Sequence, residues 1–296
     1  MGQIPFDRRP RPAVPGLART VSRRGFLVTS LAAGFAGAAG PLRAETITTG
    51  DDGMVAGEVR VPVAGGLVPA YRASPAGPGP FPTVLVIHEI FGVHEYIRDI
   101  CRRLAVLGYY AIAGELFARQ GDVSTLPDVA SILSRVVSRV PDEQVMADLD
   151  SMVDFARAEG RADLRRLAVT GFCWGGRATW LYAAHNPALR AAVAWYGMVD
   201  PPAWDPKAES VLSALPRLSV PVLGLYGARD TSIPVAHVEA LKEKLTNSAA
   251  GSRSEIVIYP EVGHAFHADY RKTYDRAAAL DGWRRMRDWF RDHGAA

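Results

Sequence analysis

Gly171-Phe172-Cys173-Trp174-Gly175-Gly176 is a sharp Gly-x-Cys-x-Gly turn between two segments of different character. The apolar run at 167–169 before it predicts a strand, and residues 177–184 after it are compatible with a helix. Strand, sharp turn and helix together are the context of a nucleophile elbow. In such a turn the central residue has a strained backbone, and side chains in place of the outer glycines would clash with neighbouring chain. The stretch therefore predicts that Cys173 projects its sulfur over the carboxyl edge of a sheet.

The position of Cys173 also has a chemical consequence. The helix that follows the turn directs its positive end at the sulfur, which favours the thiolate over the thiol. The alternative is that Cys173 is a small buried apolar residue in an ordinary strand-to-helix turn.

Strands and helices alternate along the chain from residue 83 onward. Expected strands cover residues 83–87, 109–113, 167–170, 191–195, 220–226 and 255–259, and expected helices cover 94–107, 129–140, 141–160, 177–184, 234–245 and 274–292. Two β segments at 54–63 and 67–74, split by Ala64-Gly65-Gly66, predict a hairpin before this region. The alternation predicts an α/β fold with a mostly parallel central sheet and helices on both faces. Residues 45–296 contain no evident linker or repeat, so we expect one domain.

The first 44 residues differ from the rest, because they carry seven arginines against a single acid, Asp7. An uncharged run at 26–40 follows the arginines and ends near small residues that suit a cleavage site. Residues 22–27, Ser-Arg-Arg-Gly-Phe-Leu, resemble a twin-arginine export signal. We therefore expect residues 1–44 to engage the export machinery through residues 22–27 and to be removed from an exported, periplasmic protein. The alternatives are an uncleaved N-terminal anchor and a basic tail.

Removal of this segment changes the charge of the protein. The full chain has a formal net charge of +3, and the seven arginines and one aspartate contribute +6, so the mature chain carries about −3. An acidic chain without a basic cluster is a poor nucleic-acid binder, and we expect no stable membrane association after signal removal. Two cysteines remain, Cys101 in an expected helix and Cys173 in the turn, and these places argue against a disulfide between them.

Four residues that can carry chemistry follow expected strands directly, namely Glu89, Cys173, Asp230 and His264. The carboxyl ends of parallel strands meet at one edge of a sheet, where the active sites of such folds lie. Nucleophile, acid and histidine, in that chain order, is the order that α/β-hydrolases use. His264 would take the thiol proton, and Asp230 would orient the imidazole and stabilise its charged form.

An acyl-transfer site also needs two N–H donors for the developing oxyanion. We expect the backbone N–H of Trp174, directly after the nucleophile, and of Ile90, in the loop after the strand at 83–87. Two triad members have structural alternatives, since Asp230 could cap the following helix and His264 could be a turn residue. Their joint appearance in this order, at strand ends, favours the catalytic interpretation.

The histidines raise the question of a metal. His88-Glu89 followed by His94 suggests zinc, but the helical zinc motif needs histidines four apart and position 92 is glycine. His264 and His267 lie three apart, and no third ligand is indicated. We expect no metal and no cofactor.

From about residue 83 to its C-terminus the chain resembles the dienelactone hydrolase family of α/β-hydrolases. The motifs that carry the resemblance are Glu-Ile-Phe-Gly at 89–92, Gly-Phe-Cys-Trp-Gly-Gly at 171–176, Gly-Ala-Arg-Asp at 227–230 and Gly-His-Ala-Phe at 263–266. The resemblance implies the α/β-hydrolase fold and a triad of Cys173, Asp230 and His264. It also implies that Glu89 contacts the thiol and helps to generate the thiolate when substrate binds. The alternative for Glu89 is a loop carboxylate paired with an arginine.

The chain departs from this family at the residues that bind substrate. Members that cleave dienelactones have an arginine four residues after the histidine, and Ala268 stands there. A second substrate-binding arginine cannot be aligned, and Arg135 and Arg139 are only candidates. We expect a carboxymethylenebutenolidase-like hydrolase that cleaves a lactone or carboxylic ester through a thioacyl-enzyme. The alternatives are a thioesterase or acyl-peptidase with the same triad, and a non-catalytic binding module that keeps the fold.

Overall fold

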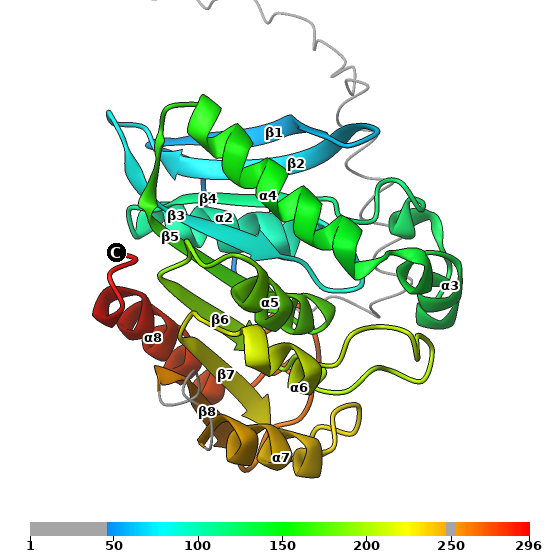
Figure 1. The fold of residues 1–296 in the computed structure, drawn as a ribbon. Helices are drawn as coiled ribbons and strands as arrows, with labels where there is room; N and C mark the ends of the chain where they lie inside the picture. The colour runs from blue at the N-terminus through cyan, green and yellow to red at the C-terminus, as the bar shows by residue number, and fades with distance from the viewer. Residues whose placement is uncertain (1–45, 247–252) are drawn as a thin grey trace, which may run out of the picture.

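A computed structural model describes residues 46–246 and 253–296, and Figure 1 shows their arrangement. The predicted export segment, residues 1–44, lies outside the described residues. The described part forms an eight-stranded sheet in the order β1-β2-β4-β3-β5-β6-β7-β8. The strands are β1 (Met54–Val63), β2 (Gly66–Pro75), β3 (Phe81–Ile87), β4 (Tyr110–Gly114), β5 (Ala162–Phe172), β6 (Ala191–Trp195), β7 (Val222–Gly227) and β8 (Glu255–Tyr259). The longer helices are α2 (Glu95–Val106), α4 (Asp142–Ala158), α5 (Trp174–His185), α7 (Val235–Thr246) and α8 (Arg276–Asp292).

Strand direction in the sheet follows the predicted pattern. β4, β3, β5, β6, β7 and β8 pair in parallel, whereas β1 pairs antiparallel with β2, and β2 pairs antiparallel with β4. The parallel strands β4 and β6 are buried along their whole length, which explains why they are apolar throughout rather than alternating. The predicted hairpin and the mostly parallel sheet are confirmed.

Helices cover both faces of the sheet, as neighbouring residues of β5 and β6 demonstrate. Gly171 faces α5, because a Cβ on this residue would lie 2.2 Å from the α5 backbone. Phe172 points to the opposite face, where its ring lies 5.6 Å from that of Tyr96 in α2. Its other neighbour, Trp195, packs on Gly282 of α8. Figure 1 shows α4 and α5 in front of the sheet and α2 behind it.

Three differences between the structure and the sequence expectations have a clear physical reason. β5 begins at Ala162 rather than at 167, because charged residues at its start, among them Asp163 and Arg166, interrupt the apolar pattern. The segment expected as one helix at 129–140 divides into α3 (Val129–Arg135) and the 3-10 turn η2 (Val137–Arg139). α6 (Val211–Ala214) was not expected, since four residues are too few to show helical periodicity.

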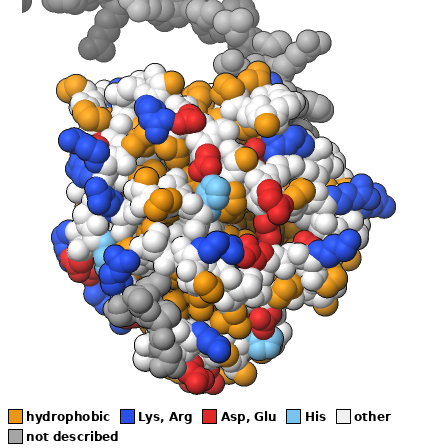
Figure 2. Space-filling model, in the orientation of Figure 1, with side chains coloured by type: hydrophobic (Ala, Val, Ile, Leu, Met, Phe, Trp, Pro, Cys, Tyr) orange, Lys and Arg blue, Asp and Glu red, His pale blue; other side chains and the backbone are white. Residues whose placement is uncertain are grey.

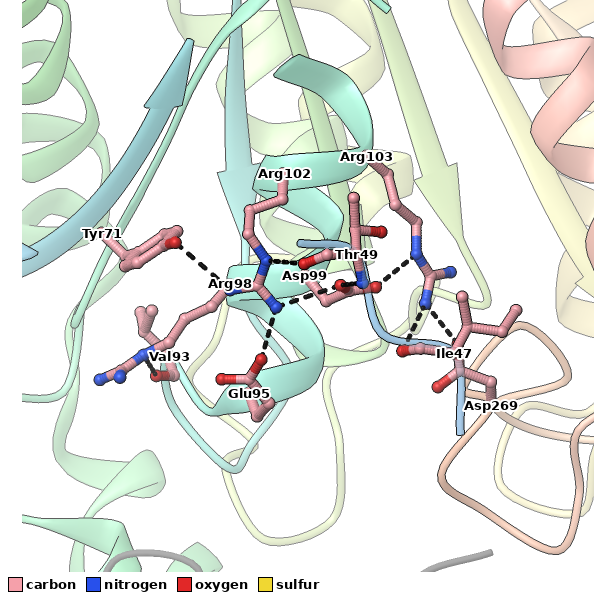
Figure 3. Close-up of polar contacts among 10 residues, drawn as sticks. All are labelled: Ile47, Thr49, Tyr71, Val93, Glu95, Arg98, Asp99, Arg102, Arg103 and Asp269. Atoms are coloured by element: carbon pink, nitrogen blue, oxygen red, sulfur yellow. Dashed lines mark hydrogen bonds and ion pairs between the residues drawn. The ribbon is translucent and has the colours of Figure 1, made fainter. Parts of the chain in front are cut away.

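A network of ion pairs and hydrogen bonds joins α2 to two distant segments, as Figure 3 shows. Arg102 donates from Nε to the Thr49 carbonyl at 2.7 Å, and the Thr49 N–H donates to Asp99 at 2.6 Å. Arg103 donates to Asp99 at 2.6 Å and to Asp269, in the loop before α8, at 2.5 Å. Residues near 49 and the loop before α8 are therefore both fixed to the same helix.

The surface is mixed in charge. On the face drawn in Figure 2, acidic and basic side chains are interspersed. In the part of the chain that the structure describes, no helix combines the length and the hydrophobicity that crossing a membrane requires.

Candidate active site

Cys173 occupies the turn between β5 and α5 and has a φ of 56°, in the left-handed region that few non-glycine residues adopt. The glycines around it allow the close approach that this turn requires. A Cβ on Gly171 would lie 2.2 Å from the Gly175 carbonyl oxygen, and a Cβ on Gly175 would lie 2.5 Å from the carbonyl oxygens of residues 87 and 88. The elbow is thus packed directly against the end of β3.

The three predicted triad residues meet at the carboxyl edge of the sheet. His264 Nε2 lies 3.2 Å from Cys173 Sγ, and His264 Nδ1 lies 2.7 Å from Asp230 Oδ2. The other carboxylate oxygen of Asp230 accepts the N–H groups of Ser232 at 2.7 Å and Ile233 at 3.0 Å. The capping interpretation and the catalytic interpretation of Asp230 are therefore both compatible with its contacts, because each uses a different oxygen.

The surroundings of His264 favour its charged form. Burial alone would lower the pKa of His264, but the negative charge of Cys173 and the hydrogen bond to Asp230 outweigh burial and raise it. A protonated imidazole beside the sulfur would stabilise the negative charge of a thiolate. Cys101, in α2, differs: it is fully buried, and burial raises the pKa of its thiol. Both cysteines are free.

The two expected oxyanion donors lie on the two loops that meet at the elbow. In the described part of the chain, neither the Trp174 N–H nor the Ile90 N–H donates a hydrogen bond. His88 links these loops, because its ring stacks on Trp174 at 5.6 Å while Nδ1 donates to the Glu89 carbonyl at 2.6 Å. Its Nε2 accepts the Leu116 N–H at 3.1 Å, and burial lowers its pKa, so His88 is a neutral structural residue.

Glu89 is buried at the same edge, where two donors converge on one of its oxygens. His94 Nε2 lies 2.9 Å from Oε2, and the Tyr270 hydroxyl donates to Oε2 at 3.0 Å. The other oxygen, Oε1, is buried and has no hydrogen-bond partner among the described residues. No hydrogen bond joins Glu89 to Cys173 in this conformation, and its ion-pair partner is His94 rather than an arginine, as far as the described residues show.

Burial of Glu89 favours the protonated acid, yet its surroundings reverse this effect. Burial alone would raise the pKa of Glu89, but the hydrogen bond and charge of His94, the charge of Arg271 and the hydrogen bond from Tyr270 lower it. The carboxylate is therefore ionised at neutral pH, which is the state that can accept a proton.

The positions considered for a substrate-binding arginine differ in exposure. Ala268 is fully buried, and Arg135 and Arg139 are exposed on α3 and η2. Arg271 was not considered, yet its charge acts on Glu89 and its guanidinium carbon lies 5.8 Å from the centre of the Phe91 ring. Among the described residues no group of three or more acidic, histidine or cysteine side chains is arranged to hold a metal ion.

Sequence reasoning missed the polar groups that surround Glu89. His94 was considered only as a zinc ligand, although it lies directly before α2 and contacts Glu89. Tyr270 had no local signal, because it is 181 residues from its partner. His267, which was also considered as a metal ligand, is buried; its Nδ1 lies 2.6 Å from the Tyr96 hydroxyl, and burial lowers its pKa well below the ordinary value.

The mostly parallel eight-stranded sheet, with a strand-turn-helix elbow at its carboxyl edge, defines the α/β-hydrolase fold, and the predicted fold class is confirmed. The sequence model of the Dienelactone hydrolase family matches residues 68–294. The chain belongs to this family and is a hydrolase, so the resemblance inferred from the motifs is confirmed.

Several relatives match almost their whole length. A protein of Methylorubrum extorquens, provisionally named a carboxymethylenebutenolidase, is 58% identical over 280 residues, which cover 94% of this chain and 95% of that protein. An Escherichia coli protein with the same provisional name is 51% identical over 271 residues, covering 90% of this chain and 98% of that protein. A crystal structure from Klebsiella pneumoniae, provisionally titled a dienelactone hydrolase, has 52% identity and a TM-score of 0.76, covering 80% of this chain and 98% of that chain.

Proposed function

We propose that the protein hydrolyses a lactone or carboxylic ester through a thioacyl-enzyme on Cys173. The observation that supports this most directly is the pair of contacts from His264, 3.2 Å to the Cys173 sulfur and 2.7 Å to Asp230. This geometry supports Cys173 as the nucleophile, His264 as a base within reach of its proton and Asp230 as the orienting carboxylate. No cofactor takes part in the proposed reaction.

In the first half of the proposed reaction, the thiolate of Cys173 attacks the carbonyl carbon of the substrate. The oxyanion that forms accepts the N–H groups of Trp174 and Ile90. The carbon–oxygen bond to the leaving group then breaks, His264 gives its proton to the leaving oxygen, and a thioester remains on Cys173. In the second half a water loses a proton to His264 and attacks the thioester, and the carbon–sulfur bond breaks to release the acid and restore the thiolate.

For Glu89 we propose an assisting role in the first step, as a second acceptor for the thiol proton. Two observations support this role. Glu89 and Cys173 each lie two residues beyond a β3–β5 partner pair, Ile87 and Gly171, so both follow the same edge of the sheet. Oε1 of Glu89 is also buried without a partner among the described residues, which leaves one oxygen able to accept a proton.

The substrate class is tested with a small panel: a dienelactone, p-nitrophenyl acetate, p-nitrophenyl butyrate and an acyl thioester. The provisional names of the relatives favour the dienelactone as a substrate. Ala268 stands where the family has an arginine that binds the carboxylate of the substrate. We therefore expect turnover of the simple esters as well, and we expect the KM for the dienelactone to be higher in wild type than in Ala268→Arg. Turnover of the thioester alone would contradict the ester and lactone proposal and favour a thioesterase.

We also propose that the chain is exported through its twin-arginine segment and is periplasmic. Replacing Arg23 and Arg24 with lysine should keep the full-length precursor inside the cell, because the export machinery reads the arginine pair. Cell fractionation checks this prediction. The prediction would be wrong if the double variant reached the periplasm, with its export segment removed, at the same level as wild type.

A further inference from the structure

The polar surroundings of Glu89 divide its two oxygens into different roles. Oε2 lies 2.9 Å from His94 Nε2 and 3.0 Å from the Tyr270 hydroxyl, whereas Oε1 has no partner in the described part of the chain. A carboxylate that is held through one oxygen cannot rotate freely, and the lone pairs of its other oxygen stay available. A proton acceptor needs this arrangement.

The two groups that hold Glu89 are themselves fixed to one another. His94 is the residue directly before α2, and Tyr270 lies in the loop before α8. Arg103 joins these segments, because it binds Asp99 of α2 at 2.6 Å and Asp269, next to Tyr270, at 2.5 Å (Figure 3). The spacing between the two donors is therefore set by a buried ion network rather than by flexible chain.

We propose that His94 is a positioning residue for Glu89: together with Tyr270 it anchors Oε2 and thereby keeps Oε1 open to the proton of the Cys173 thiol. This inference rests on the proposed function. Nε2 of His94 donates to the carboxylate, so the side chain acts through Glu89 and does not touch the reacting atoms. In this route Oε1 of the ionised carboxylate takes the thiol proton from Sγ in place of His264, which leaves the thiolate beside a neutral imidazole. Glu89 then returns that proton to the leaving oxygen.

The ionisable groups around Glu89 come from several elements. They are His88 beside it, His94 and Tyr96 at the start of α2, Tyr196 after β6, and Asp269, Tyr270 and Arg271 before α8. Burial raises the pKa of the three tyrosines and lowers that of His88, so these four groups are neutral near pH 7. Asp269 is paired with Arg103, and His94 is the only histidine in this set that contacts the Glu89 carboxylate among the described residues.

The consequence of losing His94 follows from burial. Glu89 has an exposed fraction of 1%, so without this donor its charge would be poorly compensated and the protonated acid would be favoured. Because a protonated carboxyl cannot accept the thiol proton, activity at acidic and neutral pH would fall and would recover as the pH rises.

The test measures the pH dependence of kcat/KM for p-nitrophenyl acetate and of Cys173 alkylation by iodoacetamide. In His94→Phe we expect the acid limb of both profiles to move to higher pH, with kcat/KM at pH 7 lowered roughly tenfold. His94→Gln retains a side-chain N–H donor and should restore much of the wild-type profile. His185→Phe is the matched control, because His185 forms an exposed pair with Asp150 at 2.7 Å on another part of the surface.

A second experiment distinguishes an effect of His94 through Glu89 from a general loss of stability. In a Glu89→Gln background, His94→Phe should have no further effect on either pH profile, since the group through which it acts is already neutral. The inference is overturned if His94→Phe shifts only the melting temperature and leaves both profiles at their wild-type positions, or if its effect adds in full to that of Glu89→Gln. In either case the proposed function stands as long as the wild-type protein is active and the Cys173→Ala variant is not. If Cys173→Ala retains wild-type activity, the proposed function and this inference fall together.

Discussion

Cys173→Ala is expected to lower kcat/KM for p-nitrophenyl acetate by about 10⁴-fold or more, because no other group takes over when a covalent nucleophile is removed. The contact at 3.2 Å would be lost, and His264 would have no thiol to deprotonate. The fold should survive, since the change removes one partly exposed atom at a turn and leaves the neighbouring glycines in place. The measurement is steady-state hydrolysis at several pH values, with the melting temperature recorded in parallel.

The matched control for this substitution is Cys101→Ala. Cys101 is the other cysteine of the chain and is fully buried in α2, away from the triad. We expect this variant to keep its kcat/KM and to lose some stability, because a buried sulfur is replaced by a smaller group. Wild-type activity in Cys173→Ala would contradict the catalytic interpretation of the elbow and would favour a binding module that keeps the fold.

Arg103→Met is expected to destabilise the protein by roughly 3–5 kcal/mol, because removing one partner of a buried ion pair leaves an uncompensated charge. Two buried carboxylates depend on this guanidinium, Asp99 at 2.6 Å and Asp269 at 2.5 Å, with exposed side-chain fractions of 2% and 1%. Asp269 belongs to the loop that carries Tyr270, so the substitution should also loosen one of the two groups that hold Glu89. Urea unfolding gives the stability, and the pH profile of kcat/KM reports on the site.

The control for Arg103→Met is Arg157→Met, which removes an ion pair with Asp154 on the surface. The two side chains of that pair are 62% and 72% exposed, so water replaces the lost contact and the free energy of unfolding should stay close to that of wild type. Equal free energies of unfolding for the Arg103 and Arg157 variants would show that the network around α2 does not stabilise the fold as its burial indicates.

The three candidate triad residues could be predicted from the sequence because each of them is marked by a local pattern. The Gly-x-Cys-x-Gly pattern identified the elbow at Cys173, and Asp230 and His264 each follow an apolar strand and a glycine. Parallel strands bring such residues to one edge whatever their separation, which is why residues as far apart as 91 positions could be placed together. The structure confirms this arrangement of the fold and brings the three side chains into contact.

The contacts of Glu89, in contrast, could not be predicted from the sequence. The contact with Tyr270 depends on how the loop before α8 folds back over α2, and no periodicity or motif records that path. The contact of Thr49 with Asp99 likewise joins irregular chain to a helix. In both cases the partners are set by side-chain packing and buried charge rather than by a repeated pattern, so a pattern-based prediction had no signal to use.

In the proposed reaction Cys173 carries the acyl group during turnover. The most direct measurement is to quench the reaction with p-nitrophenyl acetate in acid within the first turnover and to locate the acetyl group by peptide mass spectrometry. We expect an acetylated peptide that contains Cys173, formed at the rate of the p-nitrophenol burst and absent from Cys173→Ala. Rapid hydrolysis without an adduct on Cys173, or with the acetyl group on a different residue that is required for turnover, would contradict it.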